Sequence, residues 1–372
     1  MAVKMTEREA YIAFNMAAKV GSATVARLAA EFGGVAAAWR EFDGKTDRRG
    51  EPVDWERELE AAGKKSVSVV TRVDADYPRR LLDLPSPPMV LYVAGSPAAL
   101  SLPGVAVVGT RLPSLYGTDM AEKFAGEIAR GGMSVISGLA EGIDACAHEG
   151  AVEAGGLTIG VLGGALDKFF PECNRSLARK IVESGGAVVS EYPFGFPPGK
   201  ATFPQRNRIV AALAQGVLAV EAPAQSGTLI TCNWAKRLGR RLMAVPANLD
   251  SRASAGCWKL LREGAQLVTD GDDVLAFCRN AESKTVPVQV RRRAVVSRSA
   301  ENVSASPPTV SPLTLEESAV LRGIPSTGIT LERLAFVSKL PAATVSSATV
   351  SLRLKKLIRY LPGNRVALSK TE

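Results

Sequence analysis

Between residues 66 and 280 the chain alternates short apolar runs with longer amphipathic stretches. The apolar runs lie at 67–71, within 87–95, and at 105–108, 133–136, 157–162, 186–190, 216–220 and 241–245. Helical spacing follows most of them, over roughly 115–130, 144–154, 174–184 and 228–238. Apolar strands alternating with amphipathic helices predict an α/β fold, a Rossmann-like parallel sheet covered on both faces. Ligands of such sheets bind at the carboxyl edge of the strands.

Residues 1–65 have a helical pattern and predict an N-terminal helical bundle. One helix is expected between Thr6 and Val20, and a second ends at the glycine pair Gly33-Gly34. The short turn between them resembles a helix-hairpin-helix (SAM-like) element, whose backbone amides can bind a phosphate. A bundle that only packs against its neighbours fits the same pattern, so both interpretations stay open.

The last part of the chain predicts a basic linker at 281–312 and a winged helix at 313–372. The linker is rich in Ser, Pro and Val around the Arg291-Arg-Arg293 cluster, and a flexible segment is expected. Thr314-Leu-Glu-Glu317 is a capping box that opens a first helix. A second helix is expected over Ile329–Phe336, and a third begins at Pro341 and precedes a hairpin. Winged helices contact either DNA or protein, and the sequence leaves the choice open.

The composition narrows the classes of function. The net charge is +9, and residues 281–372 carry most of it, with 14 Lys and Arg against 6 Asp and Glu. A basic module beside a near-neutral domain favours a polyanionic partner. The five cysteines form no C-x-x-C pair and His148 is the one histidine, which argues against a zinc site or a disulfide framework. No apolar leader or membrane span is evident, so a cytoplasmic protein is expected.

The stretch Phe203-Pro-Gln-Arg-Asn-Arg-Ile209 carries the strongest candidate chemistry. It places two arginines and an asparagine at the start of an expected helix, with Lys200 and several aromatic residues just upstream. Four loops rich in Gly, Ser or Thr follow the predicted strands, at 109–111, 137–138, 163–164 and 226–228. Backbone amides of such loops bind phosphates at helix starts, and flat rings stack on exposed bases. Solvated arginines at a helix end, with aromatics that cap the core, are the alternative.

Several enzyme classes lack their sequence signature. No G-x-G-x-x-G follows the strand at 105–108, no G-x-x-x-x-G-K-[ST] occurs, and no nucleophile–base pair is evident. Asp144 and His148 are four residues apart at a helix start. These two side chains could act together as a general base, but we favour a local role in which Asp144 caps the helix and His148 forms a nearby hydrogen bond. We therefore expect no catalytic residue, no metal site and no cofactor.

Four motifs stand in the order seen in the DprA/Smf family of DNA-processing proteins. They are Gly109-Thr-Arg111, Ser137-Gly-Leu-Ala-Glu-Gly-Ile-Asp144 with His148, Phe203–Ile209, and Glu221 with Ser226-Gly-Thr-Leu-Ile230. The resemblance covers roughly residues 75–270 and is specific, because four independent motifs agree. One departure is Cys257-Trp258, where the family usually has a small polar residue and Asn. That departure puts any role of its loop in doubt.

The resemblance implies an extended Rossmann fold that binds single-stranded DNA, self-associates as a homodimer and acts in natural transformation. It also implies that the protein protects incoming strands and helps to load the RecA recombinase. Carried over to this sequence, the nucleic-acid-binding residues are Arg111, Ser137, Gly138, Lys168, Lys200, Phe203, Arg206, Asn207, Arg208, Ser226, Gly227 and Thr228. Lys168 and Lys200 lie outside the firm motifs.

Two other functions remain as alternatives. The fold resembles nucleotide-acting hydrolases of the lysine-decarboxylase-like group, but Ser226-Gly-Thr-Leu-Ile-Thr231 lacks the double glycine and the glutamate of their loop. A duplex-DNA regulator would read DNA with the winged helix and sense a ligand with the Rossmann domain. Preference for duplex over single-stranded DNA would distinguish the regulator.

Overall fold

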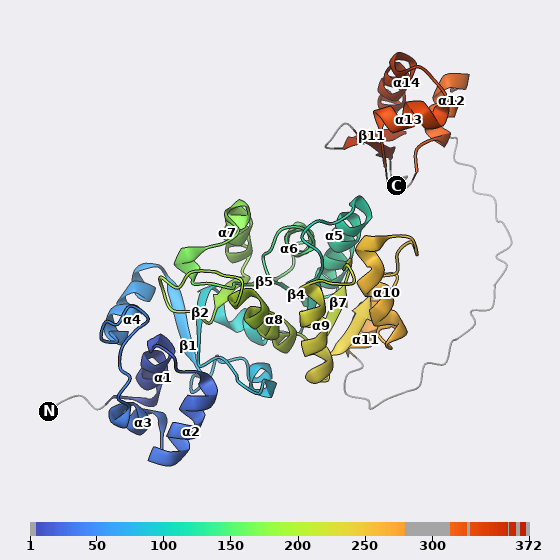
Figure 1. The fold of residues 1–372 in the computed structure, drawn as a ribbon. Coiled ribbons are helices and arrows are strands. Elements are labelled where there is room, and N and C mark those ends of the chain that lie inside the picture. The colour runs from blue at the N-terminus through green and yellow to red at the C-terminus, as the bar shows by residue number, and fades with distance from the viewer. Residues whose placement is uncertain (1–4, 280–312, 326–327, 356, 362–364, 370–372) are drawn as a thin grey trace. The chain divides into compact units, whose positions relative to one another are not determined.

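The computed structural model describes residues 5–279, 313–325, 328–355, 357–361 and 365–369 (Figure 1). The chain divides into two compact units, Met1–Lys284 and Thr285–Glu372. The predicted basic linker at 281–312 lies outside the described residues. Within the described ranges, no helix is long and apolar enough to cross a bilayer.

A nine-stranded sheet organises the first unit, in the order β1-β2-β6-β5-β4-β3-β7-β8-β9. Its strands are β1 (Val67–Thr71), β2 (Val90–Gly95), β3 (Gly104–Val108), β4 (Ser134–Ser137), β5 (Thr158–Val161), β6 (Ala187–Ser190), β7 (Gly216–Ala219), β8 (Arg241–Ala244) and β9 (Gln266–Leu267). The predicted parallel α/β sheet is confirmed for the seven strands β6-β5-β4-β3-β7-β8-β9, where every neighbouring pair is parallel. The short edge strand β9 was not foreseen.

The first two strands depart from the predicted parallel arrangement. Strand β2 pairs antiparallel with both β1 and β6, with Tyr92 opposite Val69 in one pair and Ser190 in the other. The connection from β1 to β2 contains a short 3-10 helix, η1 (Arg79–Asp83), in place of a crossover α-helix. Parallel pairing needs such a crossover, so the chain returns in the opposite direction.

Helices cover both faces of the sheet, because alternate residues of each strand point to opposite sides. Val105 and Val107 pack under α5 (Leu115–Arg130), α6 (Ile143–Glu153) and α11 (Gly271–Arg279). Ala106 and Val108 pack under α8 (Thr202–Leu213), α9 (Thr228–Arg237) and α10 (Ala255–Arg262). Helix α7 (Arg175–Glu183) lies beside α6 (Figure 1). The residues between strand and helix therefore gather at the carboxyl edge.

The N-terminal helices share a hydrophobic core with the antiparallel end of the sheet. Helices α1 (Glu7–Met16), α2 (Ser22–Phe32), α3 (Val35–Glu41) and α4 (Trp55–Lys64) precede β1. Phe14 and Trp39 belong to the same buried cluster as Val90 and Tyr92 of β2. The helices thus pack onto the sheet, and the domain boundary at residue 65 stays a prediction.

The described residues of the second unit form three helices and a small antiparallel sheet ordered β10-β12-β11. Its elements are α12 (Leu315–Arg322), β10 (Ile329–Thr330), α13 (Leu331–Ser338), α14 (Ala342–Leu354), β11 (Ile358–Leu361) and β12 (Arg365–Leu368). The capping box of Thr314 and Glu317 is present, whereas Ile329–Thr330 forms a strand and not the start of a helix. Glu317 also accepts a hydrogen bond of 2.7 Å from Lys355, which lowers the pKa of Glu317 to about 2. The winged-helix assignment stays a prediction.

Candidate functional site

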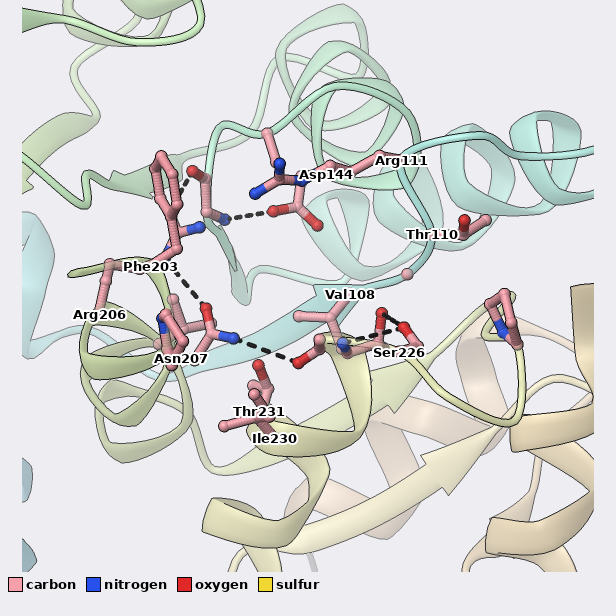
Figure 2. Close-up of a pocket in the computed structure, with 18 of the residues that line it drawn as sticks. Val108, Thr110, Arg111, Asp144, Phe203, Arg206, Asn207, Ser226, Ile230 and Thr231 are labelled. Carbon is pink, nitrogen blue, oxygen red and sulfur yellow. Dashed lines mark hydrogen bonds between the residues drawn. The ribbon is translucent and has the colours of Figure 1, made fainter. Parts of the chain in front are cut away.

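A cavity of about 430 Å³ opens at the carboxyl edge of the sheet, beside the ends of β3, β4 and β7. The starts of α8 and α9 and the loop before α6 complete its wall (Figure 2). Nine of the predicted residues line it: Arg111, Gly138, Lys200, Phe203, Arg206, Asn207, Ser226, Gly227 and Thr228. The structure therefore brings residues of all four sequence motifs around one space, together with Lys200. The motif at 137–144 takes part through Gly138 and Asp144.

Arg111 is exposed, and its loop is fixed by hydrogen bonds to the buried Glu221. Glu221 is 1% exposed and anchors this loop: its backbone oxygen accepts from Thr110 N–H at 2.7 Å, and its carboxylate accepts from Ser114 N–H at 2.7 Å. The guanidinium carbon of Arg111 lies 5.2 Å from the centre of the Phe203 ring. Neither Arg111 nor Lys200 forms an ion pair within the described residues. The cavity thus combines unneutralised positive charge with an aromatic ring.

Arg206 occupies a different environment, because it is only 4% exposed. Its guanidinium donates to the backbone oxygens of Gly138 and Val161, at the carboxyl ends of β4 and β5. Burial lowers the pKa of Arg206, and the nearby Asp144 carboxylate acts in the opposite direction. Arg206 therefore joins the ends of two neighbouring strands beside the cavity, a role that the sequence did not reveal.

Asp144 and His148 are both buried and do not bond to each other. Burial raises the pKa of Asp144, while Arg206 and a 3.0 Å hydrogen bond from Gly138 N–H favour its ionised form. Asp144 therefore fixes the Gly138 loop, and the predicted cap of α6 is wrong because Gly142 is its N-cap residue. Burial lowers the pKa of His148 to about 3, and its Nδ1 lies 2.6 Å from Thr158 Oγ1. A buried neutral imidazole without access to the cavity cannot serve as its general base.

Asn207 links α8 to the loop before α9 across the cavity. Its side-chain amide donates to Gly227 O at 3.3 Å and its oxygen accepts from Arg206 Nε at 3.1 Å. Ser226 Oγ accepts from Thr228 N–H at 3.1 Å, and α9 begins at Thr228. The arrangement fixes a helix N-terminus at the cavity wall, where the helix dipole favours an anion.

Three predicted residues lie outside this cavity. Ser137 is completely buried, and its hydroxyl donates to Val107 O at 2.6 Å. Arg208 pairs with Glu191, and both it and Lys168 line a second cavity on the other side of α8. Along α8, residues 203, 204, 206, 207 and 210 line the first cavity, and residues 205 and 208 line the second. This is the three-to-four residue spacing of one helix face.

The structure adds one aromatic residue that the sequence did not single out. Phe170 is 48% exposed, and its ring centre lies 5.8 Å from that of Phe203. With Arg111 and Phe203 it lines a small extension of the cavity. The signal available in the sequence was an aromatic pair, Phe169-Phe170, in the loop that follows the strand at 157–162.

The described residues contain no group of three or more His, Cys, Asp or Glu that could hold a metal ion. The Cys257-Trp258 departure lies on α10, where Cys257 is 1% exposed and belongs to the core under the sheet. That position gives Cys257 a packing role.

A Rossmann-like sheet with cations, a ring and a helix start around one cavity at its carboxyl edge is typical of α/β proteins that bind phosphate groups. Residues 68–279 match the family model of DNA recombination-mediator protein A. The chain is also 31% identical to the Smf protein of Synechocystis sp., over 97% of this chain and 98% of that relative. It therefore belongs to the DNA recombination-mediator protein A family, and the predicted DprA/Smf resemblance is confirmed.

Two solved structures are similar to this chain over most of their own length. The DNA processing protein A of Streptococcus pneumoniae superposes with a TM-score of 0.62 and 32% identity, covering 74% of this chain and 98% of that one. The DNA processing protein A of Helicobacter pylori superposes with a TM-score of 0.51 and 31% identity, covering 56% of this chain and 94% of that one. The latter structure was described for its single-stranded DNA binding mode.

Proposed function

We propose that this chain is a non-enzymatic recombination mediator that binds single-stranded DNA in the cavity at the carboxyl edge of its sheet. The observation that carries the proposal is the meeting of Arg111, Lys200 and Phe203 in one space, with no carboxylate paired to either cation among the described residues. Unneutralised cations attract a phosphate chain, and an adjacent ring offers a face to an exposed base.

Each part of the site has a place in this proposal. Arg111, Lys200 and the N-terminus of α9 contact phosphates. Phe203 and the exposed Phe170 stack against bases, which a duplex keeps inside its own stack. Arg206 and Asn207 act as positioning residues, because their side chains bond to the protein loops around the cavity. Ser137 supports the end of β4 from within the core.

The preference for single strands is tested by competition. A labelled oligonucleotide of about 30 nucleotides is bound by the full chain and displaced by unlabelled single-stranded or duplex DNA of the same sequence, across a salt series. The proposal predicts that single strands compete better, with a slope of about −0.7 in log affinity against log salt for each phosphate contacted. Better competition by the duplex would favour a duplex-DNA regulator instead.

The family resemblance extends the proposal to two partners, the RecA recombinase and a second copy of this chain. A mediator is expected to shorten the lag of RecA assembly on single strands that are covered by single-strand-binding protein. Light scattering during size-exclusion chromatography is expected to give twice the chain mass of 39.2 kDa. An unchanged lag would remove the RecA part of the proposal, and a single chain mass would remove the homodimer.

A further inference from the structure

A second and larger cavity, of about 810 Å³, lies between the N-terminal helices and the sheet. Its wall is formed mainly by the turn at 47–49, the loop at 191–197 after β6 and the segments at 15–22 and 86–89, and Lys168 also lines it. Its volume falls within the roughly 300–1,000 Å³ that is usual for ligand pockets. The proposed function so far assigns it nothing.

Hydrogen bonds hold the turn and the loop in place. Phe194 N–H donates to Glu58 Oε1 of α4 at 2.8 Å, and Gly195 N–H donates to Asp167 Oδ1 at 2.9 Å. The turn is closed by Asp47 N–H, which donates to Glu51 O at 2.7 Å, and by Asp47 Oδ1, which accepts from Arg49 N–H at 2.8 Å. These hydrogen bonds fix the turn at 47–49 and the loop at 191–197, so the cavity is built by the fold.

The charge that remains available on its wall is positive. Each lining carboxylate is already engaged: Asp47 by the turn, Glu58 by Phe194 N–H and Glu191 by Arg208. Arg48 and Lys168 are exposed, and in the described ranges neither forms an ion pair. An anion entering this cavity would meet these two cations without having to displace a carboxylate.

The same combination of cation and ring occurs in both cavities. The guanidinium carbon of Arg48 lies 3.8 Å from the centre of the Phe196 ring, and that ring centre lies 4.4 Å from the ring of Tyr192. In the first cavity, Arg111 lies 5.2 Å from the centre of Phe203. A planar cation on an aromatic face suits a phosphate beside a base.

One short segment reaches both spaces. Lys168 lines the second cavity, whereas Phe170, two residues later, lines the extension of the first. Helix α8 separates the two, with Phe203 on one side and Gln205 on the other. The loop at 168–170 therefore contributes one residue to each cavity.

We propose that the second cavity binds further nucleotides of the same single strand, through Lys168 and through Arg48, whose guanidinium is positioned by the Phe196 ring beneath it. The inference rests on the proposed function, because the strand enters from the first cavity. It gives the N-terminal segment a direct part in strand binding and makes the binding site longer than one cavity.

The test compares two lengths of single-stranded oligothymidylate by fluorescence anisotropy, about 6 and about 30 nucleotides, spanning the site sizes of single-strand binders. The variant is Arg48→Glu with Lys168→Glu. The control is Arg27→Glu with Lys64→Glu, which changes the net charge equally at side chains that are 72% and 79% exposed and lie outside both cavities. We expect the variant to bind the long strand about tenfold more weakly, with a salt slope reduced by about 1.4 for two phosphates. Its affinity for the short strand should match that of the control.

Three outcomes would overturn the inference, and each points to a different fault. If the wild type binds both lengths and the variant equals the control, the second cavity takes no part and the proposed function stands. If thymidine monophosphate binds the wild type, is lost in the variant and leaves long-strand affinity unchanged, the cavity is a free-nucleotide site. If the wild type binds neither length, the proposed function fails together with the inference.

Discussion

Replacing Arg206 by alanine separates a structural role of this residue from direct contact with DNA. The substitution removes the donors that bond to the carbonyl oxygens of Gly138 and Val161, two ends of parallel strands. It also removes the cation that favours the ionised form of Asp144, whose carboxyl group is buried. A hydrogen bond to a charged group contributes about 1.5–3 kcal/mol, and the guanidinium of Arg206 donates to both of these carbonyl oxygens.

We therefore expect Arg206→Ala to lower the free energy of unfolding of the first unit by about 3–6 kcal/mol, the sum for two such bonds. For a unit of this size that corresponds to a drop in Tm of roughly 6–24 °C. Adding Asp144→Asn to Arg206→Ala should recover part of the loss, because the unpaired buried charge is then gone. Urea unfolding of the single and double variants measures the loss and the recovery of the free energy of unfolding, and thermal unfolding measures the drop in Tm.

Binding of single-stranded DNA should also fall in Arg206→Ala, because the Gly138 loop loses its support. The decisive comparison is with Arg111→Ala, where the side chain is exposed and binding should fall with Tm unchanged. The reasoning is refuted if Arg206→Ala unfolds like the wild type and still loses DNA binding. The guanidinium would then contact the strand directly.

Three further predictions concern single residues. Unfolded His148 takes up a proton below about pH 6.5, whereas the folded residue has a pKa of about 3 and takes it up only near that pH. The free energy of unfolding of the wild type should therefore fall by roughly 1.4 kcal/mol per pH unit as the pH drops through this window. Urea titrations of His148→Gln should lack this pH dependence. Phe170→Ala should weaken single-strand binding by about 1–3 kcal/mol with an unchanged salt slope, and a changed slope would argue against stacking. Gly142→Ala should destabilise the fold and reduce DNA binding, because Gly142 has φ +81° and an added Cβ would lie 2.8 Å from Arg111 Cα. Gly155→Ala, with φ +72° and open space around it, is the matched control in thermal unfolding and should show a smaller loss.

The sequence predicted the parallel part of the sheet because each buried strand is a continuous apolar run followed by a loop and an amphipathic helix. Those loops converge at one edge for a geometric reason, since parallel strands all end there. This geometric rule was sufficient to predict that Arg111, Phe203 and Ser226 lie near one another. The antiparallel turn of β2 was not predictable in the same way, because apolar alternation carries no direction.

The sequence could not divide the arginines of the Phe203–Ile209 stretch between their roles. Arg206 and Arg208 look alike in a motif, but a helix turns them to opposite sides, one into the protein and one towards Glu191. The partner of each arises from a loop distant in sequence, at 138 and 161 for Arg206. Phe170 was missed for a related reason, because its exposure depends on how its loop lies beside α8.

The most direct test of the central claim is the affinity of Arg111→Ala for a single-stranded oligonucleotide of about 30 nucleotides, measured by fluorescence anisotropy at two salt concentrations beside the Tm of the variant. The proposed function predicts weaker binding, a salt slope smaller by about 0.7, and a wild-type Tm. Wild-type affinity and slope in this variant would contradict it, because the exposed cation over Phe203 would then not be in contact with the strand.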